Sequence, residues 1–296
     1  MIPNPEQIGT SMTEPTRHAA TGWQRFWNAG GWWRAVILAA GYYAIYEFLG
    51  FLVGLVFPDE GSVRGAEGSA MDVFIAIALP IILASIVLVI FALSIGWLRP
   101  LFARQTIRGR GWMWVAIAIV LVINVSSLLS TNFEDAGLPL VASWLFTGLF
   151  VGFAEEVLTR GFVVNLMRKA GRGEIAVALV SSGIFAALHL GNLFTTAQGL
   201  TTTLLQVVYT FCFGLCMYLA LRVTGNLIWP ILLHASTDPT LFLHEEHPLG
   251  GNPFSIIAAF STYLIVATGV ILLVVFLVSE RRRARRDGLS APQLGS

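Results

Sequence analysis

Six ionisable side chains that could carry out acid–base chemistry lie inside otherwise apolar stretches in the second half of the sequence. A charged group costs free energy in an apolar environment, so residues of this kind are usually kept for a function. One carboxylate and two imidazoles among them could activate water. The carboxylate would be the general base, one imidazole would hold the water and shuttle protons, and the other would donate to an oxyanion. The six are Glu155, Glu156, Arg160, His189, His234 and Asp238.

The spacing of these residues indicates which of them share a helix face. Glu156 and Arg160 are four residues apart, so they stack on one face and can form an ion pair. Glu155 points about 100° away from that face and has no local partner, which leaves it available as the general base. His234 and Asp238 are also four residues apart, as a histidine and its orienting carboxylate would be.

The depths of these groups predict that they meet. At about 1.5 Å per residue from one end of their helices, Glu155 lies roughly 21 Å deep and His189 roughly 22 Å deep. His234 and Asp238 lie roughly 13 and 20 Å deep on a third helix. Taken singly, a lone histidine on an apolar helix would more often be a buried packing residue. Independent packing residues need not converge in depth, so the coincidence favours a shared function.

The same residues leave a second chemistry open. Glu155, His189 and His234 together are also a set that could bind a catalytic zinc ion. The common zinc motif His-Glu-x-x-His is absent, and the residue types alone do not separate a metal-bound from a metal-free water.

The composition shows which kind of protein must position these groups. Of the 296 residues, 56% are hydrophobic and only 12% are charged, and the mean hydropathy is +0.74. A soluble domain is nearer a quarter charged. A disordered protein, a disulfide scaffold and an ordinary soluble enzyme are therefore excluded, which leaves a polytopic membrane protein. Cys212 and Cys216, one helical turn apart, are expected to be small core residues rather than a disulfide.

Apolar stretches of about 20 residues predict an all-α fold, a polytopic bundle of about eight transmembrane helices. We expect a cytoplasmic N-terminal segment at 1–32, one transmembrane domain at 33–279 and a basic cytoplasmic tail at 280–296. Pro230 and Pro239 predict that the seventh helix is broken. The predicted spans are 33–57, 71–98, 112–131, 138–169, 174–193, 202–222, 225–243 and 254–279.

The positions of the charges predict the orientation. With the N-terminus in the cytoplasm, every Lys and Arg except Arg64 falls in or beside a cytoplasmic segment, and most acidic residues outside the spans fall in external loops. Both termini are therefore expected in the cytoplasm. The arginine run at 281–286 is expected to contact anionic lipid headgroups, so no nucleic-acid partner is predicted.

Three motifs in this order resemble those of the CPBP family, the CAAX prenyl endopeptidases and Abi-type intramembrane proteases. They are Glu155-Glu156-x-x-x-Arg160, Phe185-x-x-x-His189 and His234-x-x-x-Asp238. The resemblance covers roughly residues 140–243, the expected protease core. It implies an all-helical fold, an active site inside the membrane that opens toward the cytoplasm, and endopeptidase activity on a membrane-associated peptide or protein.

The resemblance also implies a role for each residue. Glu155 would activate water together with His189, and His234 and Asp238 would form the oxyanion-stabilising pair. Glu156 and Arg160 match the remaining polar positions of the first motif, and Asn192 is a further supporting candidate. The last position is commonly Asn, and an ionised Asp238 cannot donate a hydrogen bond.

We favour a glutamate-type mechanism without a cofactor, because Glu155 and His189 suffice to bind water; zinc is the alternative. Two other functions stay open. One is a non-catalytic immunity or scaffold protein of the same fold, and the other is a proton-coupled transporter, against which the first half offers no matching broken helices. The abundance of arginine over lysine suggests a GC-rich genome and a bacterial plasma membrane.

Overall fold

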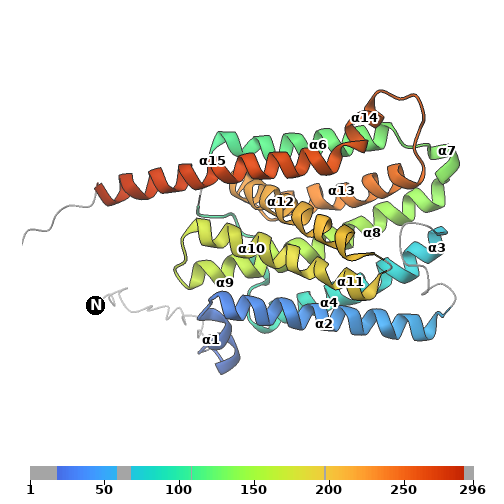
Figure 1. Ribbon diagram of the computed structural model, residues 1–296. Helices are drawn as coiled ribbons and strands as arrows, with labels where there is room; N and C mark the ends of the chain where they lie inside the picture. Colours follow the sequence, from blue (N-terminus) through green and yellow to red (C-terminus); the bar gives the residue numbers. More distant parts are fainter. Residues whose placement is uncertain (1–18, 59–67, 108, 197, 290–296) are drawn as a thin grey trace, which may run out of the picture.

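The computed structural model describes residues 19–58, 68–107, 109–196 and 198–289, and this part of the chain consists of helices and their connections, with one isolated β-bridge between Thr131 and Pro248. Long helices run alongside one another in alternating directions (Figure 1). They are α2 (Trp32–Val56), α4 (Leu79–Ser94), α6 (Trp114–Leu129), α8 (Leu138–Glu156), α10 (Glu174–Leu188), α12 (Leu200–Thr224), α13 (Ile228–Glu246) and α15 (Ser261–Leu289).

Shorter helical pieces extend or connect the long ones. The π-helical turn η1 (Phe74–Ala78) joins α3 (Ala70–Val73) to α4, and the π-helical turn η3 (Val157–Val163) joins α8 to α9 (Val164–Lys169). The remaining pieces extend the long helices or lie in the connections between them. They are α1 (Gly22–Asn28), α5 (Leu98–Phe102), η2 (Gly111–Met113), α7 (Phe133–Ala136), η4 (His189–Gly191), α11 (Asn192–Thr195) and α14 (Phe254–Ala259).

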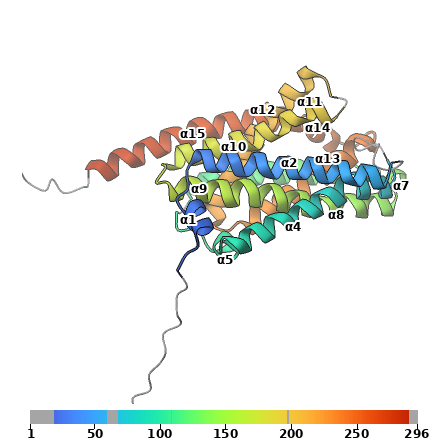
Figure 2. The same cartoon turned by 90° about the horizontal axis from the view of Figure 1, so that it is seen from below.

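The prediction of an all-helical polytopic membrane bundle is confirmed. Within the described residues, seven helical stretches are long and apolar enough to cross a membrane. Helix α1 and the far end of α15 lie at the same end of the bundle, and α7 lies at the other, in both views (Figures 1 and 2). The seven stretches are Trp32–Val56, Ala70–Ser94, Gly111–Leu129, Leu138–Lys169, Glu174–Thr195, Leu200–Thr224 and Ser261–Arg286.

Helix α13 corresponds to the remaining predicted span, 225–243, and is not among these seven. It has 19 residues and carries Asp238, Glu245 and Glu246. It packs against α6, α8 and α12, so neighbouring helices rather than lipid surround much of it. A helix with so many polar residues is tolerated at membrane depth where protein encloses it.

The expectation that prolines break this helix is wrong, because α13 runs without interruption from Ile228 to Glu246. Pro230 lies in the first turn, where backbone N–H groups have no partner within the helix in any case. Pro239 lies inside the helix, and the backbone hydrogen bond that it removes does not end the helix. The ring of Pro239 instead packs closely against α8.

Two glycines allow α8 and α13 to approach closely. A Cβ atom on Gly148 would lie 2.3 Å from Pro239 Cγ and 2.5 Å from the Ala235 carbonyl oxygen. A Cβ atom on Gly152 would lie 2.6 Å from the Ala235 nitrogen and 2.7 Å from the Ile231 oxygen. Small residues four apart are the usual means by which membrane helices bring their backbones together. Position 152 therefore accepts no side chain without separating the two helices.

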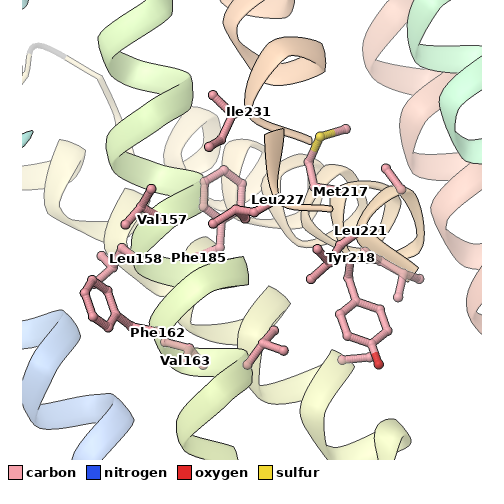
Figure 3. Close-up of a cluster of buried hydrophobic side chains, with 14 of the residues drawn as sticks. Val157, Leu158, Phe162, Val163, Phe185, Met217, Tyr218, Leu221, Leu227 and Ile231 are labelled. Atoms are coloured by element: carbon pink, nitrogen blue, oxygen red, sulfur yellow. The ribbon is translucent and has the colours of Figure 1, made fainter. Parts of the chain in front are cut away.

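A buried apolar cluster closes the bundle just beyond the end of α8 (Figure 3). Leu158 and Phe162 of η3 lie on one side of the cluster, Phe185 of α10 and Leu227 at the start of α13 in its middle and Met217 of α12 on the other side, and all five are 1% exposed or less. Lipid is as apolar as these side chains, so close packing rather than exclusion of water holds them together. The cluster joins η3, α10, α12 and the start of α13.

Ion pairs between side chains join several helices at the end of the bundle that holds α1 and the far end of α15. Glu174, the first residue of α10, accepts hydrogen bonds from Arg168 Nε at 2.9 Å and from Arg168 Nη2 at 2.7 Å. Arg222 of α12 donates to the same carboxylate at 2.9 Å and lies 3.6 Å from Glu280 of α15. This network links α9, α10, α12 and α15.

The glycine contact predicts a stability difference between two alanine variants. Gly152→Ala should lower the free energy of unfolding by about 1–3 kcal/mol, because the new methyl group meets the backbone of α13. Gly54→Ala is the matched control, since no atom lies within 4 Å of a Cβ placed there. It should be neutral or stabilising, as alanine favours helix. Thermal unfolding in detergent measures both, and equal midpoints would contradict the close α8–α13 contact.

Candidate active site

Three helices bring the predicted residues to one place. Glu155 and Glu156 end α8, His189 caps the C-terminus of α10, and His234 and Asp238 lie in the middle of α13. His234 Nε2 lies 3.6 Å from Glu155 Oε2 and 3.7 Å from Asp238 Oδ2. One imidazole nitrogen therefore faces two carboxylates from two helices.

The other nitrogen of His234 is held by Glu156, a contact that the sequence analysis missed. His234 Nδ1 lies 2.8 Å from Glu156 Oε1. The ionised carboxylate can only accept, so Nδ1 is the donor. Adjacent residues on a helix point about 100° apart, which lets Glu155 and Glu156 reach opposite nitrogens of one ring. The paired glutamates in the sequence were the signal for this arrangement.

Arg160 completes a buried ion pair behind His234. Its Nη1 lies 3.2 Å from Glu156 Oε1, as their spacing predicts, and both side chains are fully buried. Nη1 also donates to the Thr159 hydroxyl, and Nη2 donates to the Gly214 carbonyl of α12 at 2.7 Å. The guanidinium lies 4.6 Å from the centre of the Phe185 ring. Arg160 thus fixes Glu156, and Glu156 fixes His234.

Aromatic rings hold the His234 imidazole edge-on from two sides. The ring centres of Phe213 and Phe185 lie 4.9 and 5.8 Å from that of His234, at interplanar angles of 77° and 89°. Only 2% of the His234 side chain is exposed. The ring is therefore fixed in orientation and shielded from bulk solvent.

His189 presents one free ring nitrogen near this cluster. Its Nδ1 donates to the Phe185 carbonyl oxygen at 2.9 Å, so in the neutral ring Nε2 is the acceptor. The Phe185 ring contacts both histidines, with its centre 4.9 Å from that of His189 and 5.8 Å from that of His234. The side chain of His189 is half-buried, unlike the enclosed ring of His234.

The site has a closed side and an open side. Glu156 and Arg160 are fully buried, whereas the side chains of Glu155 and Asp238 are 25% and 32% exposed. Glu155 is the carboxylate that a water molecule or a substrate can reach. Glu156 and Arg160 therefore form a buried pair that fixes His234, and Glu155 is accessible for acid–base chemistry.

Asn192 is placed at the edge of this arrangement. It begins α11, and its side-chain amide donates to Gln206 Oε1 of α12 at 2.9 Å. The contact ties the turn after His189 to α12. Within the described residues no hydrogen bond joins Asn192 to Glu155, His234 or Asp238.

The donors do not form a metal-binding group as they stand. Zinc would be held by Glu155, His189 and His234, at about 2.0–2.2 Å from each ligand atom. Across the part of the chain that the structure describes, no three His, Cys, Asp or Glu side chains come together as such a group. His234 Nδ1 is bonded to Glu156, which leaves Nε2 as the ring nitrogen that zinc would use.

The fold and the site together define a polytopic membrane protein with an enclosed acid–base centre. Residues 137–240 match the family model of the Rce1-like type II CAAX prenyl endopeptidases. The match runs from the start of α8 into α13 and includes Glu155, His189, His234 and Asp238. The resemblance to this family drawn from the three motifs is thereby confirmed over these residues, and at the family level the match supports an intramembrane protease. No curated protein matches the chain at a significant level.

The two glutamates should differ in their effect on stability. Glu156→Gln leaves Arg160 buried without its counter-charge and should lower the free energy of unfolding by about 3–5 kcal/mol. Glu155→Gln alters a partly exposed group and should change it by less than about 1 kcal/mol. Unfolding in detergent followed by intrinsic tryptophan fluorescence compares the two. A Glu155→Gln variant less stable than Glu156→Gln would contradict the assignment of a fixing pair.

Proposed function

We propose that the protein is an intramembrane endopeptidase of the CAAX-protease type, in which Glu155 activates a water molecule that attacks a peptide bond. One observation carries the proposal. The His234 ring is fixed on one nitrogen by the buried Glu156–Arg160 pair and faces Glu155 and Asp238 with the other. An immobile donor beside an accessible carboxylate is what hydrolysis of an amide requires.

In the proposed mechanism, Glu155 takes a proton from water as the oxygen attacks the carbonyl carbon of the scissile bond. His189 Nε2 accepts a hydrogen bond from that water, because Nδ1 is used on Phe185. His234, protonated on both nitrogens, donates Nδ1–H to Glu156 and Nε2–H to the oxyanion. When the C–N bond breaks, Glu155 returns its proton to the leaving amine.

Asp238 acts through His234 in this account. An ionised carboxylate cannot donate to the oxyanion, but a negative charge 3.7 Å from Nε2 favours a proton on that nitrogen. Asp238 thus helps His234 to act as the hydrogen-bond donor, whereas an Asn at this position could itself donate. This gives Asp238 a positioning role rather than direct contact with the reacting carbonyl.

We place the protein in a bacterial plasma membrane, with the site opening toward the cytoplasm. Basic residues gather at the end of the bundle that holds α1, α9 and the far end of α15, and basic loops stay on the cytoplasmic side. The substrate is a membrane-associated peptide or protein that reaches the site from the bilayer.

Replacement of Glu155 should abolish proteolysis. Purified protein in proteoliposomes is given fluorescent reporter peptides: farnesylated and unmodified CAAX peptides and a transmembrane-anchored peptide. Glu155→Gln should reduce the rate of cleavage at least about 100-fold, because the general base is lost. Glu245→Gln, an exposed glutamate near the end of α13, is the matched control and should cleave as the wild type does.

The same assay separates the other two functions. Cleavage by Glu155→Gln at the wild-type rate would contradict Glu155 as the general base, and no cleavage of any reporter by the wild type would contradict a protease. A cellular phenotype that Glu155→Gln still supports would favour a binding protein. Proton-driven uptake by the same liposomes would favour a transporter.

Metal removal tests the chemistry independently. A glutamate-type mechanism predicts that dialysis against a strong chelator leaves the cleavage rate unchanged, and that purified active protein contains far less than one metal ion per chain by mass spectrometry. Loss of activity on chelation with recovery on added zinc would contradict it and favour a zinc-activated water.

A further inference from the structure

Helix α2 lies outside the family-matched residues but carries polar side chains in an otherwise apolar stretch. Tyr42, Tyr43, Tyr46 and Glu47 form two adjacent faces, with Tyr42 and Tyr46 on one and Tyr43 and Glu47 on the other. Helix α2 packs against α10, α9 and the turn η3 that follows Glu156. It therefore borders the site without contributing to any of the three motifs.

The hydroxyl of Tyr42 is buried and has no partner. Its side chain is 7% exposed, and no hydrogen-bonding atom of the described residues reaches the hydroxyl. The helix that carries Tyr42 and Tyr46 contacts the turn η3, which directly follows Glu155 and Glu156. An unpaired buried donor costs about 1–3 kcal/mol, so a tyrosine in place of phenylalanine here requires an explanation.

A second contact fixes how close α2 stands to the site. A Cβ atom on Gly191 would lie 1.7 Å from the Tyr43 hydroxyl and 2.4 Å from its Cζ. Gly191 ends the turn that begins with His189. The Tyr43 ring thus rests directly on the backbone of that turn, and α2 is held at a set distance from His189.

The spacing of the two tyrosines matches an extended peptide. Residues four apart on a helix are about 6 Å apart along its axis. In an extended chain, carbonyl groups that face the same way repeat about every 6.6–6.8 Å. Two phenolic O–H donors at this spacing can bond to alternate carbonyl groups of one strand.

We infer that α2 is the substrate-binding wall of the active site, in which Tyr42 and Tyr46 donate hydrogen bonds to backbone carbonyls of an extended substrate peptide. The strand runs along α2, with its scissile bond beside Glu155 and His234. This inference rests on the proposed protease function and adds substrate-binding residues from outside the matched segment.

The test is peptide binding in a background that cannot cleave. The probe is whichever fluorescent reporter the wild type cleaves, and its dissociation constant is measured on Glu155→Gln and on Glu155→Gln with Tyr42→Phe added. One lost hydrogen bond should weaken binding about 2–10-fold, and a further Tyr46→Phe by a similar factor. Tyr42→Phe should not lower the midpoint of thermal unfolding, because its hydroxyl has no partner in the free protein.

Tyr218→Phe is the matched control with the opposite pattern. Its hydroxyl bonds to Glu174 and accepts from Arg222 at 3.1 Å in the ionic network of helix ends. This variant should unfold at a lower temperature and bind the peptide as the Glu155→Gln parent does.

The failures of the two proposals are distinguishable. A wild type that cleaves no reporter overturns the protease itself. A wild type that cleaves, with unchanged peptide affinity in the Tyr42→Phe variant, overturns only the substrate-binding wall. A Tyr42→Phe variant that loses stability and keeps its affinity also overturns it, because the hydroxyl would then be structural.

Discussion

The contact between α8 and α13 is the constraint on which the site depends. Gly148 and Gly152 let the two backbones meet, and no side chain would fit at either position. Glu155 and Glu156 follow Gly152 after about one turn of α8. Because this contact sets the distance between the helices, Glu155 and Glu156 reach the one imidazole that α13 presents. A larger separation would take His234 out of reach of both glutamates and leave a buried imidazole without its hydrogen-bond partner.

Around that contact, buried groups fix the site and exposed groups remain for chemistry. Arg160, held by the Gly214 carbonyl and the face of Phe185, neutralises Glu156, and Glu156 holds His234. This buried chain has few alternative arrangements, because every member is closed off from water. Replacement of one member would leave the others unpaired, which is costly. Glu155 and Asp238 stay accessible on the other side of the ring, so a single histidine separates the fixed part of the site from the reactive part.

Much of this could be predicted from the sequence, because depth and helical spacing are simple geometry. The all-helical class follows from the length of the apolar stretches, and the Glu156–Arg160 pair follows from 100° per residue. A rise of about 1.5 Å per residue brings Glu155 level with His189 and Asp238. Other features could not be predicted. The bond between Glu156 and His234 depends on how two helices are rotated about their axes, and the continuity of α13 through Pro239 depends on what α8 places beside it. In the sequence, Tyr42 is an aromatic residue in an apolar stretch like many others, and its type and spacing do not mark it as a functional residue. Only three-dimensional packing shows its hydroxyl to be buried without a partner.

The central claim is that His234 and Glu155 act on the same peptide bond. It is tested most directly by an experimental structure of the Glu155→Gln variant with an uncleaved substrate peptide bound. The measured quantity is the distance between His234 Nε2 and the carbonyl oxygen of the scissile bond. The account predicts about 3 Å, the reach of an oxyanion donor, with residue 155 on the opposite side of the carbonyl carbon. A peptide bound elsewhere, or one whose scissile carbonyl faces away from His234, would contradict it.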